Sequence, residues 1–210
     1  MAITELIFPS IKTDPKSLEE IETNWPTFSS LLIDPNPGLL HAFRGWVVSE
    51  EDKDVTKDFK EFLLFEWKEE AAFHSFVTGQ QFATFASTVR HLLNGPPTLQ
   101  LFDTNVSPKD IGLAPVMEVI RVPIQSPEAA GTAVKVWKTI SQVVMEEGSK
   151  NHVLHGTSTN LENSLFVGIV GWASPEESFQ SGLNMLSTLG DASRVAVEVS
   201  ALDLPALQEA

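Results

Sequence analysis

One carboxylate interrupts an apolar stretch at a place where it could transfer protons. In the segment FLLFEW, residues 62–67, alternation places Glu66 on the strand face shared by Phe62 and Leu64. Burial raises the pKa of a carboxyl group, so that it can act as a general acid or base near neutral pH. A similar segment later in the chain carries Gly171 at the equivalent place. This asymmetry makes Glu66 a candidate catalytic residue.

Two further carboxylates break the same kind of pattern. Glu5 shares its predicted strand face with Ile3 and Ile7, and Glu118 occupies the matching place in the segment MEVI. Either could act as an acid or a base if its face is buried. A glutamate near a strand end can instead bond to neighbouring backbone or to an arginine, and we expect this structural role for both.

Two histidines occupy similar places, in the segments LHA and LHG. A neutral imidazole in a pocket is the usual proton shuttle near neutral pH, and His41 is therefore a second catalytic candidate. The alternative is that His41 and His155 are packing residues retained through repetition. Alternation directs Arg44 and Trp46 to the face opposite His41.

Aromatic residues gather after the central apolar strand. They could line a cavity for a flat hydrophobic ligand, or they could fill the core between a sheet and its helices. The predicted substrate-binding residues are Trp67, Phe73, Phe76, Phe82 and Phe85. The first half also has the charged loop and Glu66, so we expect the working pocket there.

Composition excludes several classes of function. The net charge of −14 argues against binding to nucleic acid or to an anionic membrane. The absence of cysteine removes disulfides, thiolate nucleophiles and cysteine metal sites. His152 and His155 are three residues apart, which on a strand points them to opposite faces, so no metal site is predicted. No phosphate-binding loop or nucleophile elbow is present, and no cofactor is predicted.

The N-terminal residues MAITELIF lack the basic start and long apolar run of a signal peptide. No run approaches the roughly 18 apolar residues that are needed to span a bilayer. We therefore expect a cytoplasmic protein.

The first half reads as β-α-β-β-α-β. Its strands are expected at residues 3–8, 39–48, 62–67 and 98–102. A helix is expected from Ser17, with Glu20 completing a capping box, and Pro26 predicts a kink or break near residue 24. Residues 49–58 read as a charged, solvated loop, and 69–93 as helical with a break near Gly79.

The second half has the same order after a linker at 103–113. Its strands are expected at residues 115–122, 152–159, 165–173 and 194–199. One helix begins at Pro127 and ends at Gly148, and another follows the capping segment SPEE at 174–177.

The two halves can be aligned residue by residue. The matching positions are 4–7 with 117–120, Trp25 with Trp137, 40–42 with 154–156, Trp67 with Trp172, and Phe73 with Phe179. A β-α-β-β-α-β unit is a ferredoxin-like repeat whose sheet has helices on one face only. We therefore predict an α+β fold in which repeats at 1–103 and 114–210 pack sheet to sheet and form one integrated barrel.

The opening TELIFPSIK and the block EWKEEAAFHSFVTGQQFATF, with its second copy GWASPEESF, resemble the dimeric α+β barrel superfamily. The match is to the antibiotic-biosynthesis-monooxygenase-like (ABM) proteins, in the fused two-copy form found in fungi. The resemblance covers nearly the whole chain. The resemblance is specific for the fold but only weakly indicates a function, because the matching residues are mostly packing residues.

The resemblance implies a site between the sheet and its covering helices. Members of the superfamily include cofactor-free monooxygenases, polyketide cyclases and haem-degrading enzymes. They often carry a helix histidine at the position that aligns with Phe73 and Phe179. Here His74 follows one residue later, about 100° further around the helix, and is the third catalytic candidate. The first strand lacks the asparagine of the haem-degrading relatives.

These observations predict a cofactor-independent enzyme of specialised metabolism, a cyclase or isomerase acting on a hydrophobic, polyketide- or terpenoid-like molecule. One alternative is a cofactor-free ABM-type monooxygenase. Another is a non-catalytic small-molecule-binding or accessory protein. Because the fused barrel already covers both sheets, the chain is expected to be a monomer or a homodimer.

Overall fold

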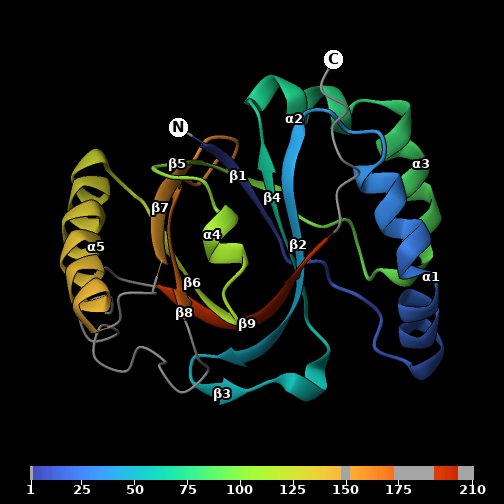
Figure 1. Cartoon of the computed structure of the whole chain (residues 1–210), viewed down its shortest axis with the longest axis horizontal. Coiled ribbons are helices and arrows are strands. Elements are labelled where there is room, and N and C mark those ends of the chain that lie inside the picture. The colour runs from blue at the N-terminus through green and yellow to red at the C-terminus, as the bar shows by residue number, and fades with distance from the viewer. Residues whose placement is uncertain (1, 148–151, 173–191, 203–210) are drawn as a thin grey trace.

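The computed structural model describes residues 2–147, 152–172 and 192–202. Their strands form one antiparallel sheet in the order β3-β2-β4-β1-β5-β7-β8-β6-β9, and an additional pairing of β2 with β9 closes it into a barrel (Figure 1). The strands are β1 Ala2–Ile7, β2 Leu39–Glu50, β3 Lys53–Asp54, β4 Glu61–Trp67, β5 Gln100–Thr104, β6 Val116–Pro123, β7 His152–Ser158, β8 Leu165–Trp172 and β9 Ser193–Ala201.

Two strand pairs join the halves of the chain. β5 pairs with β7 and β2 pairs with β9, both antiparallel. The predicted α+β architecture of two ferredoxin-like repeats in one barrel is confirmed. The inward-facing side chains of both halves meet in one apolar cluster, which includes Leu6, Phe43, Leu64, Met117 and Ile169.

Helices cover the outside of the barrel on two opposite sides (Figure 1). They are α1 Pro15–Ile33, α2 Glu70–Val77, α3 Gln80–Val89 with the 3₁₀ turn η2 Arg90–Leu92, and α5 Pro127–Glu147. The first three pack over the outer face of β1 and β4, and α5 packs over β7 and β8. The predicted break in helical structure near Gly79 is confirmed, because α2 ends before it and α3 begins after it.

Helix α1 differs from its prediction at two points. It begins at Pro15, and the side chain of Asp14 caps it by accepting from the backbone N–H of Ser17 at 3.1 Å. It also continues through Pro26, so the expected break near residue 24 does not occur, and the alternative of a kink there stays a prediction. Proline costs about 3 kcal/mol in a helix interior. Ile21 and Phe28, on either side of Pro26, are both buried, and burial of this kind favours the helical conformation.

The segment between the repeats is not a plain linker. It contains the last residues of β5 and a short helix, α4 Lys109–Gly112, which lies at the mouth of the barrel (Figure 1). Ile111 belongs to the interior cluster. A Cβ at Gly112 would lie 2.5 Å from the ring of Phe43, and one at Gly171 would lie 2.9 Å from Ala114. Helix α4 therefore packs tightly against both halves.

The charged segment 49–58 is also more ordered than predicted. It forms a hairpin of β2 with β3 and the 3₁₀ turn η1 Thr56–Asp58. Glu51 and Asp52 both accept hydrogen bonds from Arg194 of β9. The predicted C-cap at Gly148, the helix after the capping segment 174–177, and Phe179 lie outside the described residues.

The strand register corrects one alignment between the repeats. Glu66 lies opposite His41, whereas Gly171, its counterpart, lies opposite His152. His41 therefore corresponds to His152, and the predicted match with His155 is wrong. The reason is alternation: His41 and His152 point toward the barrel interior, and His155 points to the outside, where its ring stacks on Phe166. Within the described residues, no helix is long and apolar enough to cross a membrane.

Candidate functional site

A cavity of about 680 Å³ lies between the outer face of the first-half sheet and helices α1, α2 and α3. Its sheet side is lined by residues of β1 and β4 that include Ile7, Leu63 and Phe65. The helices and the turn after α3 contribute Ile21, Trp25, Phe28, Phe76, Phe82, Phe85 and Pro96, among others. A volume and an apolar lining of this kind are typical of small-molecule sites.

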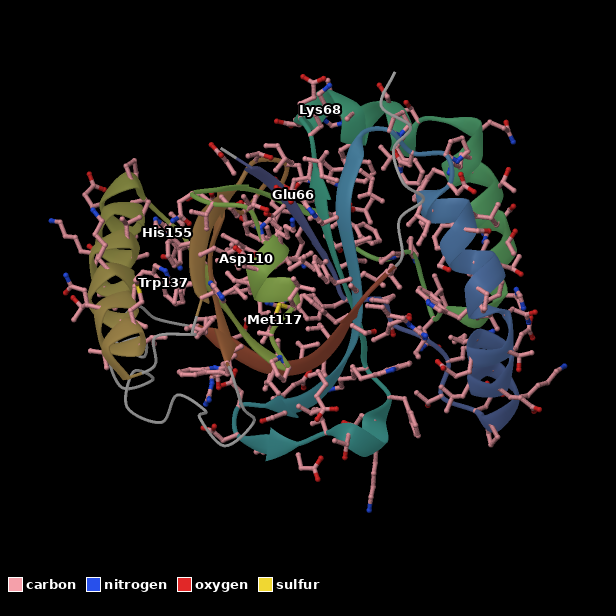
Figure 2. The ribbon with its side chains drawn as sticks, viewed as in Figure 1. Glu66, Lys68, Asp110, Met117, Trp137 and His155 are labelled. Atoms are coloured by element: carbon pink, nitrogen blue, oxygen red, sulfur yellow. The ribbon has the colours of Figure 1, made fainter. Side chains whose placement is uncertain are left out.

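One sheet position under the covering helix differs between the two halves. Leu63 and Gly168 each stand four residues before the tryptophan that ends their strand, Trp67 or Trp172. The ring of Trp137 from α5 lies directly on Gly168, where a Cβ would approach it to 2.3 Å. Figure 2 shows Trp137 between α5 and the barrel. In the first half Leu63 occupies that position, and Trp25 instead packs on the Arg44 guanidinium at 3.8 Å.

Glu5 is a buried carboxyl group at the sheet side of the cavity. It is 2% exposed and stands on β1 between Phe65 of β4 and Leu101 of β5. Its Oε2 accepts a hydrogen bond of 2.7 Å from the indole Nε1 of Trp67. Burial raises the pKa of Glu5 to about 7, against the smaller lowering effect of the Trp67 hydrogen bond. A carboxyl group with this pKa changes protonation state near neutral pH, as a general acid or base must.

A second carboxylate, Glu61, lines the cavity but is held in an ion pair. Its Oε1 accepts a hydrogen bond of 2.6 Å from Nε of Arg44, and Arg44 also donates to Glu22 of α1 at 2.8 Å. Burial raises the pKa of Glu61, while the Arg44 charge acts in the opposite direction. Glu61 is therefore fixed by its ion pair. Of the two carboxyl groups that line the cavity, Glu5 forms no ion pair with a described residue.

The predicted aromatic residues divide into two groups. Phe76, Phe82 and Phe85 line the cavity. Trp67 and Phe73 are 1% and 4% exposed and lie behind the cavity wall, where their rings make an edge contact with centroids 5.7 Å apart. Trp67 therefore does not line the cavity itself, and its link to the cavity is the hydrogen bond that it donates to Glu5. A role in substrate binding stays a prediction for all five.

Glu66 and His41 come together at a different place, the barrel mouth. Nδ1 of His41 lies 2.6 Å from Oε2 of Glu66, and the same oxygen accepts a hydrogen bond of 2.8 Å from Ser107 in the segment before α4. Figure 2 shows Glu66 above α4, over the barrel. Both residues face the interior and not the helices, so they are on the opposite side of the sheet from Glu5.

His74 lies on the solvent side of α2. Its side chain is 58% exposed, and its Nε2 lies 3.3 Å from Oε1 of Glu70 one turn earlier. The neighbouring Phe73 takes the buried position, as the offset of about 100° per residue requires. Catalytic roles for Glu66, His41 and His74 stay predictions, and none of the three lines the cavity. Within the described parts of the chain, no three His, Asp or Glu residues are grouped closely enough to hold a metal ion.

Glu5 is the residue whose surroundings were hardest to predict from the sequence. Alternation correctly places it on the helix-facing side with Ile3 and Ile7. Alternation does not show which strand pairs with β1 in the sheet. The pairing of Ile3 with Trp67 brings the indole next to Glu5. Among the described residues, no arginine or lysine forms an ion pair with this carboxyl group.

A scan against protein-family models finds no match for this chain, and a search of curated proteins finds no significant match. Solved structures do match. A protein of Fusobacterium nucleatum provisionally described as a monooxygenase aligns over 98% of this chain and 96% of its own, with 13% identity and a TM-score of 0.58. One from Lactobacillus acidophilus with the same description aligns over 98% of each chain, with 11% identity and a TM-score of 0.59.

Shorter proteins match one half of the chain. SnoaB, a cofactor-independent oxygenase from Streptomyces nogalater, covers 50% of this chain with 95% of its own, at 16% identity and a TM-score of 0.37. At these identities, the two full-length matches establish a shared fold and do not establish a function.

Proposed function

We propose that the chain is a cofactor-independent enzyme that moves a proton on a hydrophobic small molecule bound in the cavity, with Glu5 as the general base. One observation carries the proposal. A buried carboxyl group with a pKa of about 7 lies at the wall of a cavity of about 680 Å³ that is otherwise largely apolar. A base with this pKa can accept a proton from a weakly acidic substrate and return it.

The cavity favours a neutral, enolisable substrate with an aromatic or polyketide-like skeleton. Its walls include Phe65, Phe76 and Trp25, which suit a flat apolar body. In the reaction, the Glu5 carboxylate takes a proton from carbon, and the bonding electrons remain on the substrate as an enolate. Returning the proton to a different atom completes an isomerisation. Attack of the enolate on a carbonyl of the same molecule, followed by protonation of its oxygen, completes a cyclisation.

Oxygenation is the second candidate function, and it begins with the same proton transfer. The two full-length structural matches are both provisionally described as monooxygenases, which supports this candidate. An electron-rich enolate can reduce dioxygen itself. For conversion of a CH₂ group to a carbonyl, the substrate supplies all four electrons, one oxygen atom enters the product, and the other leaves as water.

Exchange of substrate hydrogen for deuterium tests the shared step before any product is known. The protein is incubated in D₂O with anthrone-like and β-diketone-like compounds, and mass spectrometry measures deuterium at the acidic carbon. We expect exchange to increase with pH, with a midpoint near the Glu5 pKa of about 7, and to be lost in E5Q. Oxygen uptake measured in parallel separates oxygenation from isomerisation.

E66Q is the matched comparison for E5Q. Both substitutions exchange a buried carboxyl for an amide of nearly the same shape, one facing the cavity and one facing the barrel mouth. Loss of exchange in E66Q with retention in E5Q would overturn the assignment of Glu5 and support the barrel mouth. Tight binding of the compounds without exchange or oxygen uptake would favour a non-catalytic binding protein.

A further inference from the structure

Glu5 and Glu118 occupy equivalent places in the two repeats. Each lies on the first strand of its half, on the face that the helices cover, and each is almost completely buried, at 2% and 0% exposed. Their partners differ. Glu5 accepts from the Trp67 indole, whereas Glu118 accepts from the guanidinium of Arg194 on β9.

The strand register identifies the first-half counterpart of Arg194. On β9, Arg194 lies opposite Ile120, two residues beyond Glu118. On β5, Gln100 lies opposite Leu6, so the preceding residue, Leu99, stands next to Ile7, two residues beyond Glu5. Leu99 lines the cavity.

We propose that position 99 decides which of the two repeat-related glutamates can serve a bound molecule: Leu99 leaves Glu5 open to the cavity, and Arg194 holds Glu118 in a closed ion pair. The inference rests on the proposed function of Glu5 and deepens it. It names Leu99 as a specificity-determining residue of the same site, because Leu99 places no cation at the position that corresponds to Arg194. A neutral molecule with an acidic hydrogen suits such a site, because it brings no negative charge toward Glu5.

The physical basis is the cost of burying charge. A carboxylate in an apolar environment stays ionised only with a compensating charge or several hydrogen bonds. Arg194 supplies that charge to Glu118, and it also donates to Asp52 on the β2–β3 hairpin, which fixes the guanidinium in place. Leu99 is aliphatic and therefore supplies no compensating positive charge to Glu5.

The charged groups that line the cavity or flank Glu5 come from β4, β5 and η2. Asp103 lies diagonally across on β5, since it stands opposite Ile3. Glu61 of β4 lines the same cavity and is neutralised by Arg44. From the helical side, Arg90 of η2 reaches the cavity wall and is exposed to solvent. The indole of Trp67 is the group that bonds directly to Glu5.

The test introduces a cation at position 99 and measures Glu5 directly. In protein labelled with ¹³C-glutamate, the carboxyl resonance of Glu5 is identified by its loss in E5Q, and its titration midpoint is followed in L99R, with L99M as the control for shape. We expect L99R to lower the Glu5 midpoint by at least about one pH unit, as an opposite charge nearby does. L99M should leave it unchanged.

Deuterium exchange on the same samples separates this inference from the proposed function. If L99R shifts the midpoint but the native protein never catalyses exchange, the role of position 99 stands and the proposed function fails. An unchanged midpoint in folded L99R, or an equal shift in L99M, overturns the inference. If L99R does not fold, L99K places a slimmer cation there, and its midpoint is judged by the same criteria.

Discussion

The indole Nε1 of Trp67 lies 2.7 Å from Oε2 of Glu5, and both side chains are almost completely buried. The two residues come from neighbouring strands, β4 and β1, and are separated by 62 positions in the chain. This hydrogen bond is the feature that moderates the effect of burial on the carboxyl group, because it favours the charged form. Trp67 is thus a positioning residue for the proposed base.

Replacing Trp67 with Phe should raise the pKa of Glu5 further, since the hydrogen bond that favours the carboxylate is lost. The pH–rate profile of deuterium exchange in W67F should move to higher pH. Loss of the buried hydrogen bond should also lower the free energy of unfolding by about 1–3 kcal/mol. W172F removes the matching indole of the second repeat and serves as the control. A profile that shifts equally in W172F would contradict the role of Trp67.

Glu5 should also make stability depend on pH. Its pKa is about 7 in the folded chain against an ordinary value near 4.5, so between these values the folded state retains a proton that the unfolded state has lost. Stability from this group is therefore fully present below pH 4.5, decreases as pH rises through 7, and then stays constant. The total loss is about 3 kcal/mol. Urea denaturation of the native protein and E5Q at several pH values checks this, and an equal slope in both would contradict it.

Gly168 should not tolerate a side chain. Because a Cβ there would lie 2.3 Å from the Trp137 ring, G168A should lower the free energy of unfolding by about 1–3 kcal/mol. The control is G131A on α5, where a Cβ meets nothing within 4 Å and alanine should stabilise the helix by about 0.5–1 kcal/mol. Thermal melting curves of the two variants should shift in opposite directions. A neutral G168A would mean that Trp137 can move off the sheet.

Ser107 should matter for stability and not for proton transfer. It donates to Oε2 of buried Glu66 and accepts from the backbone N–H of Lys109, so it ties the segment before α4 to the barrel mouth. S107A should cost about 1–3 kcal/mol, measured by urea denaturation. S87A, which removes an exposed hydroxyl from α3, should cost less than about 0.5 kcal/mol. Loss of deuterium exchange in folded S107A would argue that the barrel mouth takes part in the reaction.

Much of this architecture follows from local patterns in the chain. Alternation and turn residues place nearly every described strand within two residues of its observed bounds, and the tryptophan pair at 67 and 172 aligns the repeats. The error at His155 shows the limit of such alignment. Shifting an alignment by one residue moves a side chain to the other face of a sheet. The segments LHA and LHG are too short to determine the correct alignment, which the strand register shows.

The candidate site could be predicted only in part, because it depends on contacts between distant segments. The cavity wall residues Phe76, Phe82 and Phe85 follow from helical spacing. The different surroundings of Glu5 and Glu66 could not be predicted in this way. Both interrupt apolar strands, and only the sheet order and the seating of α4 show that one faces an open cavity and the other a hydrogen-bonded cluster.

The pairing of β2 with β9 has a consequence for how the chain folds as it is synthesised. β2 begins at Leu39 and β9 begins at Ser193, so the strand that completes the edge of the first repeat emerges from the ribosome more than a hundred residues later. Until then, β2 presents unpaired backbone groups that could recruit another strand. Contacts so distant in sequence form slowly. The nascent first repeat should therefore depend on chaperones or on its covering helices until the barrel closes.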